Sequence, residues 1–155
     1  MERDTLNIHK NKVHEVLFAS YSTYFFTFLI GVYLDLVFKL KVFSSSIIMP
    51  VGFVLLILGT FMIVWAQRTS RDLKKETITK ETFSNGPYAF TRTPTNFGLF
   101  FLMLGFGLIV NAFFVIFLSI ISFFVAKFIF LQKEERILAE KYGAPYLEYK
   151  KIVKF

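Results

Sequence analysis

Three long apolar blocks dominate this sequence, at about residues 16–40, 47–66 and 97–131. An α-helix rises 1.5 Å per residue, so about 20 apolar residues are needed to cross the roughly 30 Å hydrocarbon core of a bilayer. The first two blocks fit that length as single helices. The third would form a helix of about 50 Å, which is too long for one crossing. We therefore expect an integral membrane protein whose third block folds back on itself.

Asn111 lies inside the third block and divides it into two arms, at about 94–110 and 112–131. A polar residue at this point indicates a tight turn between two helices. The first arm carries three glycines, Gly98, Gly105 and Gly107. Small residues of this kind let neighbouring membrane helices approach closely. The sequence thus predicts one all-α, polytopic membrane domain with four transmembrane helices, the last two forming a tight helical hairpin.

The basic residues lie mostly outside the apolar blocks. Three Lys or Arg residues lie in the N-terminal segment, six in residues 67–96 and six in the tail at 132–155, whereas the turn at Asn111 has none. With four spans these three segments share one side, which the positive-inside rule makes cytosolic, together with both termini. The net charge of +7 therefore predicts contact with anionic lipid headgroups and no binding of nucleic acid.

Few polar residues are available for a metal site or a transport path. Cys is absent, and the two histidines, His9 and His14, both lie in the N-terminal segment. We expect no metal site; a metal held by this pair is the weaker alternative. Asp35 and Lys39 lie four residues apart on one helical face, so we expect an ion pair at the membrane interface, with a substrate role as the alternative. A transporter would need polar groups at mid-membrane, and we see little sign of them.

The segment before the third predicted helix can form an anion site. Gly86-Pro87-Tyr88 is a turn signal. Thr93 and Pro94 suit the N-cap and first turn of a helix. Arg92 would then lie beside the positive end of the helix dipole, where free N–H groups and a guanidinium suit a carboxylate or phosphate. The alternative is an ordinary capped helix with an Arg that extends to the interface.

Charged and aromatic residues follow the last apolar block. Lys127, Leu131, Glu134 and Glu135 fall on one helical face by their i, i+4, i+7 and i+8 spacing. Paired carboxylates near the membrane need a cation or hydrogen-bond donors, unless they belong to a solvated helix end. Gly143 suits a helix C-cap. The tail tyrosines Tyr142, Tyr146 and Tyr149 could face a base or a cation, although rings in such places more often anchor the chain at the interface.

Four motifs lie in order around the predicted hairpin: Gly86-Pro87-Tyr88, Arg92-Thr93-Pro94-Thr95-Asn96-Phe97-Gly98, Glu134-Glu135 with Leu138, and Gly143-Ala144-Pro145-Tyr146-Leu147-Glu148-Tyr149-Lys150-Lys151. Each motif is weak alone, but their order and spacing are specific. From about Trp65 to Val153 the chain resembles the isoprenylcysteine carboxyl methyltransferases and the related phospholipid methyltransferases. It departs from them at two positions, since Thr93 stands where that family has His and Asn96 where it has Tyr.

This resemblance implies a membrane methyltransferase that uses S-adenosylmethionine, bound at the cytosolic face by the hairpin, the loop at 67–93 and the tail at 132–155. It implies a lipophilic acceptor, a prenylcysteine-like carboxylate or a lipid, that enters from the bilayer. The implied cofactor-binding residues are Tyr88, Arg92, Thr93, Asn96, Glu134, Glu135 and Tyr146. The implied catalytic residues are Arg92 and Glu134. The missing His leaves open a non-catalytic member that binds a lipid or a partner protein.

Overall fold

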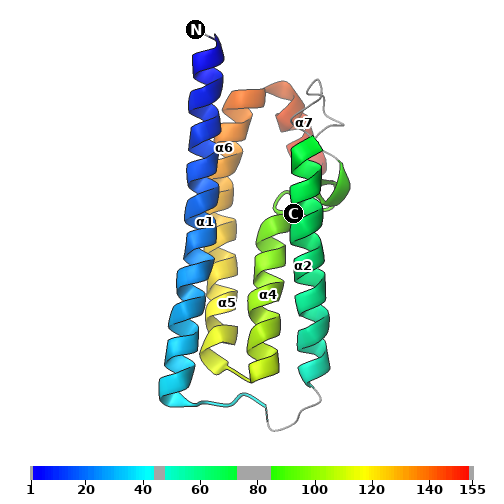
Figure 1. Ribbon diagram of the computed structural model, residues 1–155. Helices are drawn as coiled ribbons and strands as arrows, with labels where there is room; N and C mark the ends of the chain where they lie inside the picture. The colour runs from blue at the N-terminus through cyan, green and yellow to red at the C-terminus, as the bar shows by residue number, and fades with distance from the viewer. Residues whose placement is uncertain (1, 44–47, 73–84, 154–155) are drawn as a thin grey trace.

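The computed structural model describes residues 2–43, 48–72 and 85–153 of the chain. Within these ranges the protein is entirely helical, and no strand is present. Figure 1 shows long helices standing side by side, with short helices gathered at one end. The all-α fold class is therefore confirmed for the described residues. Part of the predicted loop at 67–93, namely residues 73–84, lies outside them.

The first two apolar blocks form α1 (Glu2–Phe38) and α2 (Met49–Asp72). Their parts that are long and apolar enough to cross a membrane are Glu15–Phe38 and Met49–Ser70. Lys39 follows α1 with a φ of 51°, a left-handed conformation that stops a right-handed helix. Pro50 falls in the first turn of α2, as predicted, because no intrahelical partner for its missing N–H is lost there.

The third apolar block forms two helical segments joined at Asn111. The first is α4 (Pro94–Val110). The second begins as α5 (Phe113–Val125), passes through a π-helical turn, η3 (Ala126–Phe130), and continues as α6 (Leu131–Tyr142). The continuous stretch Phe113–Glu140 is the third helix long enough to span a membrane. The 17 residues of α4 would cover only about 26 Å, so the structure gives three candidate spans and one shorter apolar helix.

Asn111 makes the turn through both its backbone and its side chain. Its φ of 56° and ψ of 45° are left-handed, a conformation that Asn adopts more readily than most residues. Its side-chain oxygen accepts hydrogen bonds of 2.9 Å from the backbone N–H groups of Val42 and Phe43. Its amide donates to the Phe43 carbonyl at 2.6 Å. The same residue therefore ends α4 and ties the segment after α1 to the turn.

Helices α2 and α4 touch through two pairs of opposed glycines. A Cβ atom added to Gly52 would lie 2.7 Å from the Gly105 carbonyl oxygen, and one added to Gly59 would lie 2.7 Å from that of Gly98. The seven-residue spacing of the glycines is the same in both helices. Gly107 instead lies against α5. The predicted close approach at the three α4 glycines is confirmed, and Gly52 and Gly59 supply partners that the sequence did not reveal.

The prediction of an ion pair between Asp35 and Lys39 was wrong. The Asp35 carboxylate instead accepts hydrogen bonds from the backbone N–H groups of Phe114, at 3.0 Å, and Val115, at 2.9 Å. No ion pair between Asp35 and Lys39 is found among the described residues. The first N–H groups of a helix have no intrahelical partners, and negative charge is favoured there. Asp35 of α1 therefore caps α5 from a distance of 79 positions in the chain.

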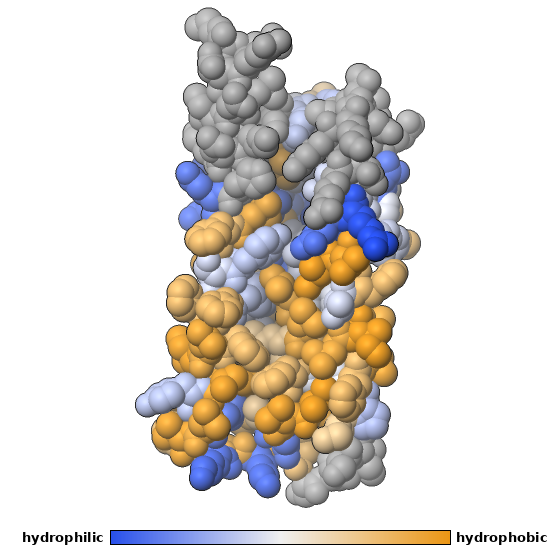
Figure 2. Space-filling view, viewed as in Figure 1, coloured by the Kyte–Doolittle hydropathy of each residue, from blue (hydrophilic) through white to orange (hydrophobic). Residues whose placement is uncertain are grey.

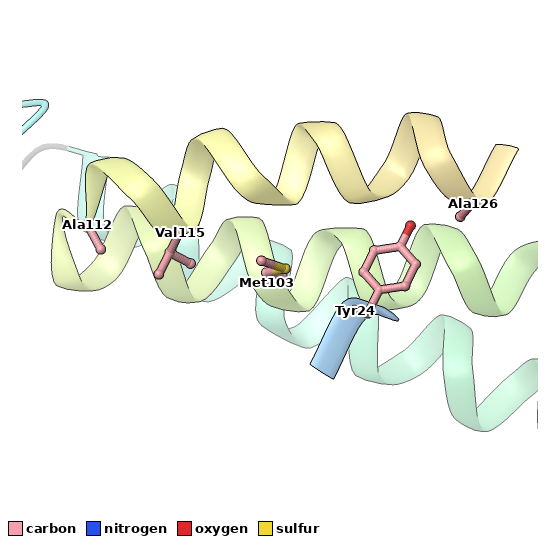
Figure 3. Close-up of a cluster of buried hydrophobic side chains, with 5 residues drawn as sticks. All are labelled: Tyr24, Met103, Ala112, Val115 and Ala126. Carbon is pink, nitrogen blue, oxygen red and sulfur yellow. The ribbon is translucent and has the colours of Figure 1, made fainter. Parts of the chain in front are cut away.

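The outer surface of the bundle is apolar and its buried core is small. Figure 2 shows hydrophobic side chains covering the length of the bundle between more polar ends. The main buried cluster, drawn in Figure 3, consists of Tyr24, Met103, Ala112, Val115 and Ala126. Each candidate span leaves most of its residues unburied within the chain. Large apolar side chains facing outward are what a lipid environment requires, so the structure fits an integral membrane protein.

Candidate functional site

The predicted site residues lie at one end of the bundle, opposite the Asn111 turn. Four elements supply them: η2 (Gly86–Ala89), the start of α4, the α6 helix and the short α7 helix (Ala144–Ile152). Helix α7 folds back at Gly143, whose φ of 61° and ψ of −133° are accessible only to glycine. The Gly143 N–H donates to the Ala139 carbonyl at 3.0 Å. The predicted C-cap at Gly143 is confirmed, and it brings the tail back over α6.

Arg92 and Glu135 meet in a buried ion pair. An Arg92 guanidinium nitrogen donates to Oε1 of Glu135. The Lys150 ammonium lies 2.7 Å from the other oxygen, Oε2. Two cations thus offset the cost of burying one carboxylate. The motifs placed Arg92 and Glu135 in the site; Lys150 was quoted there only as part of the tail motif, without a role.

The neighbouring carboxyl group of Glu134 has no such partner. A helix of 28 residues measures about 42 Å, so the polar run that begins at Gln132 extends beyond the hydrocarbon core. Within the described part of the chain, Glu134 makes no ion pair or hydrogen bond. Burial, and then the negative charge of Glu135, raise the pKa of Glu134 to about 7. Glu134 is therefore a carboxyl group that gains from the arrival of a cation.

Two of the three tail tyrosines, Tyr146 and Tyr149, are buried and do not serve as interfacial anchors, whereas Tyr142 is half-buried. Tyr146 and Tyr149 are each 3% exposed and pack with Tyr88. The Tyr149 hydroxyl donates to the Tyr88 carbonyl at 2.8 Å, which fastens α7 to η2. Burial, strengthened by the nearby glutamates, raises the pKa of the phenols of Tyr88, Tyr146 and Tyr149. These hydroxyl groups are therefore neutral, and the anchoring role that the sequence favoured is corrected.

The start of α4 differs in detail from the prediction. Thr93 occupies the N-cap position, but its side chain makes no capping hydrogen bond. Instead the Thr93 N–H donates to the Thr91 hydroxyl at 3.3 Å. Asn96 is buried, and its side-chain oxygen accepts a hydrogen bond of 3.3 Å from the Ser20 hydroxyl. Asn96 stands where the family that the chain resembles has a tyrosine. In this protein it links α4 to α1.

A pocket opens beside this cluster, and both polar and apolar side chains line it. Its lining residues are Arg92, Thr93, Asn96, Phe97, Phe123, Lys127 and Leu131. The π-helical turn η3 carries Lys127, and such turns frequently occur at functional sites. Lys127 and Leu131 thus line the pocket, whereas Glu135 of the same predicted face pairs with Arg92.

Helix α1 contributes residues that the sequence did not identify as part of the site. Ser20 bonds to Asn96. Tyr21 lies near Thr95 and Glu134. A single Ser or Tyr within an apolar span carries no motif. The available signal was the i, i+4, i+7 spacing of Ser20, Tyr24 and Thr27 on α1, which places these polar residues on one inward-facing side of the helix.

Metal binding finds no support in this part of the chain. Among the described residues, no group of three or more His, Cys, Asp or Glu side chains could hold a metal ion. The side chains of His9 and His14 lie outside the described residues.

Comparison with protein families assigns the chain to one family. A family model described as phospholipid methyltransferase matches residues 47–145. Searches of curated proteins and of solved structures each found no match. The matched segment runs from the start of α2 to the turn after α6, and it contains Arg92, Asn96 and the Glu134-Glu135 pair. Because the match covers well over half of the chain, the protein belongs to the phospholipid methyltransferase family, whose members are membrane methyltransferases.

Proposed function

We propose that this protein transfers a methyl group from S-adenosylmethionine to a lipophilic acceptor that enters from the bilayer. One observation carries the proposal. Two adjacent carboxyl groups lie beside a half-apolar pocket at the end of a membrane bundle; Glu135 has two cationic partners, and Glu134 has none among the described residues. Membership of a methyltransferase family supports the reaction type.

The residues present fit the charges of the cofactor. S-adenosylmethionine bears an ammonium, a sulfonium and a carboxylate. Glu134 suits the cationic groups, because it is half-buried and has no counter-charge among the described residues. Arg92 lines the pocket and suits the carboxylate. If Arg92 turns toward a ligand, Lys150 still neutralises Glu135, so this exchange strands no buried charge.

The remaining proposed cofactor residues surround these charges. Thr93 and Asn96 offer polar groups in the lining of the pocket. Tyr88 and Tyr146 offer neutral aromatic rings beside the glutamates, which suit an adenine or a sulfonium. When bound, the cofactor supplies a methyl group on positively charged sulfur.

The chain itself would contribute positioning and exclusion of water. Methyl transfer breaks the carbon–sulfur bond of the methyl group as a new bond forms to an acceptor oxygen or nitrogen. The attack is in line, so most of the catalysis comes from holding the two partners in register. Phe97, Phe123 and Leu131 give the pocket a dry wall that can hold the acceptor's chain. A carboxylate acceptor needs no base, whereas an amine must lose a proton.

Isothermal titration of the detergent-solubilised protein with S-adenosylmethionine tests the proposal. We expect binding by the wild type and about tenfold weaker binding by Glu134→Gln, which loses the charge but keeps the shape. Glu140→Gln is the matched control, because Glu140 is exposed on the same helix. Absence of binding to the wild type at millimolar concentration would sink the proposal.

The second candidate function is lipid or partner binding without catalysis. Thr93 and Asn96 stand where the resembling family has His and Tyr, and this is the observation that favours it. Thr93 offers a hydroxyl but no imidazole. Incubation of the protein with labelled cofactor and a membrane lipid extract separates the two candidates. Transfer of label to any lipid rules out the non-catalytic function.

A further inference from the structure

The hydroxyl group of Tyr24 is an exception among the buried polar groups of the bundle. Tyr24 is 4% exposed and belongs to the same core cluster as Met103 and Ala126. Its hydroxyl has no hydrogen-bond partner within the described part of the chain. Buried hydroxyls nearly always have one, because burial removes their hydrogen bonds to water. A bound ligand could supply the missing partner.

The exception occupies one position in a stripe of polar residues that are otherwise paired. Ser20, Tyr24 and Thr27 follow i, i+4, i+7 spacing on α1 and face inward. The Ser20 hydroxyl bonds to Asn96. The Thr27 hydroxyl lies 2.7 Å from the Ser122 hydroxyl. Since the residues on both sides are paired, the unpaired hydroxyl is a local property of Tyr24 and not a misfit of the whole helix.

Tyr24 lies near the pocket but is not one of its lining residues. Asn96 lines the pocket and bonds to Ser20, which precedes Tyr24 by four residues, or about 6 Å of helix rise. Figure 3 shows the Tyr24 ring extending from α1 toward the helix that carries Ala126. Ala126 begins the π-helical turn that continues into pocket-lining Lys127. Tyr24 thus lies one helical turn along α1 from Ser20, the hydrogen-bonding partner of pocket-lining Asn96.

The donors in this region define the class of ligand. The Asn96 side-chain oxygen is occupied by Ser20, which leaves its amide nitrogen to donate; no hydrogen bond from that nitrogen is found among the described residues. The Tyr24 hydroxyl can also donate. Two donors call for an oxygen with free lone pairs. The apolar wall of the pocket, which includes Phe97, calls for a hydrocarbon chain attached to that oxygen.

We infer that Tyr24 and Asn96 bind a carbonyl oxygen of the methyl acceptor, an amphiphile whose carbonyl or carboxylate group is joined to a long apolar chain. The inference rests on the proposed function, which requires an acceptor in this bundle. The oxygen belongs to one of two sources, a prenylcysteine-like carboxylate or the acyl ester of a glycerolipid. Tyr24 lies outside residues 47–145, which the family model matches, so this contact belongs to α1 of the present chain.

The test compares Tyr24→Phe, which removes only the hydroxyl, with Tyr33→Phe. Tyr33 lies on the same helix but is 66% exposed on the outer surface. Calorimetric titration in detergent, without S-adenosylmethionine, uses N-acetyl-S-farnesylcysteine as one probe and dioleoylphosphatidylethanolamine as the other. We expect Tyr24→Phe to weaken binding of at least one probe about tenfold, which is the loss of one hydrogen bond. Tyr33→Phe should bind as the wild type does.

The outcomes also distinguish the two sources. Weakening of the farnesyl probe alone identifies the carboxylate, weakening of the lipid alone identifies the ester, and weakening of both identifies the shared carbonyl chemistry. The inference is overturned if the wild type binds neither probe, or if Tyr24→Phe binds both with wild-type affinity. These titrations contain no S-adenosylmethionine. If the cofactor fails to bind in its own titration, the proposed function is ruled out, but the result with the two probes can still be interpreted.

A second variant and a stability measurement guard against a folding artefact. Asn96→Asp keeps the oxygen that Ser20 needs, removes the amide donor and adds a negative charge that opposes a bound oxygen, so it should weaken probe binding by about tenfold or more. Without ligand, Tyr24→Phe should melt no lower than the wild type, because the hydroxyl has no partner to lose. A lower melting temperature for Tyr24→Phe would reveal a structural partner for the hydroxyl and would count against the inference.

Discussion

Two helix pairs in this bundle are held together by different chemistry. Helices α2 and α4 meet through opposed glycines at backbone distance. Helices α1 and α5 meet through hydroxyl groups and one carboxylate, including the contacts between Thr27 and Ser122 and from Asp35 to the start of α5. In lipid the hydrophobic effect does not drive helices together, so close packing and hydrogen bonds are the available means. The α2–α4 pair uses close packing, whereas the α1–α5 pair adds hydrogen bonds to a close approach at Gly31, where an added Cβ would lie 3.1 Å from Cα of Val115.

The difference teaches which half of the bundle can adapt to a ligand. Backbone atoms in contact at Gly52 and Gly105 have no side chain that can move aside. Hydroxyl and amide groups can exchange a protein partner for a ligand. Helix α1 also contributes to the polar site, because its Ser20 bonds to Asn96 of α4. We therefore regard α2 and α4 as the scaffold and the α1–α5 side as the adaptable part.

The largest expected effect comes from breaking the scaffold. Gly105→Val would place a branched side chain 2.7 Å from the Gly52 carbonyl oxygen, with backbone on both sides. Overpacking of this kind costs about 3 kcal/mol or more when the backbone must move. We expect Gly105→Val to lose the cooperative thermal transition or to melt far below the wild type, as followed by circular dichroism in detergent.

The control for this change lies on the lipid-facing side of the same pair. Ile57→Val alters an exposed residue of α2 and should leave the melting temperature nearly unchanged. If Gly105→Val melts with the wild type, the close contact between α2 and α4 is not the scaffold that we describe.

A smaller loss is expected when the cap of α5 is removed. Asp35→Ala leaves the N–H groups of Phe114 and Val115 without their carboxylate and should cost about 1–2 kcal/mol in the free energy of unfolding. Lys39→Gln should cost almost nothing, because Lys39 makes no ion pair with Asp35. Chemical unfolding of the two variants gives the comparison. Equal losses would restore the ion pair that the sequence suggested.

The parts of the fold that could be predicted have causes within a few residues along the chain. The α4 helix begins at Pro94 because its first turn tolerates proline. The chain turns at Asn111 because that residue adopts a left-handed conformation and can bond to nearby backbone. Helix α6 ends at Gly143 because only glycine adopts that backbone geometry. The apolar parts of α1 and α2 followed from hydrophobic blocks and the dimensions of a bilayer, whereas α1 itself begins well before its block, at Glu2.

The parts that could not be predicted depend on which distant segments meet. No residue near Asp35 in the sequence indicates that the start of α5 lies beside it. The spacing of Gly52 and Gly59 shows its meaning only when the register against α4 is known. Lys150 became part of the site because α7 folds back over α6. The unpaired hydroxyl of Tyr24 is likewise a property of three packed helices, and no motif marks it.

The pH dependence of S-adenosylmethionine binding tests whether the adaptable side of the bundle holds the cofactor through Glu134. The pKa of Glu134 is raised to about 7, so its carboxyl group is mostly neutral at pH 6 and mostly ionised at pH 8. A cationic ligand favours the ionised form. We expect the affinity for S-adenosylmethionine to rise about tenfold from pH 6 to pH 8, relative to the same series with Glu134→Gln.

The variant corrects for titration of the cofactor's own amine and of neighbouring phenols. Identical pH profiles for the two proteins would show that Glu134 does not hold the cation.

The smallest expected effect separates paired from unpaired hydroxyls on α1. Thr27→Val keeps the shape of the side chain but removes its interhelical hydrogen bond to Ser122 and its donation to the Thr23 carbonyl within α1. Hydrogen bonds between membrane helices contribute about 0.6 kcal/mol on average, and we expect a loss of that size in the free energy of unfolding. Tyr24→Phe should show no loss, because its hydroxyl bonds to nothing in the described chain. Unfolding curves recorded for both variants in the same detergent provide the measurement. If the two losses are equal, the Tyr24 hydroxyl has a partner within the protein, and the α1–α5 side holds itself together as completely as the glycine side does.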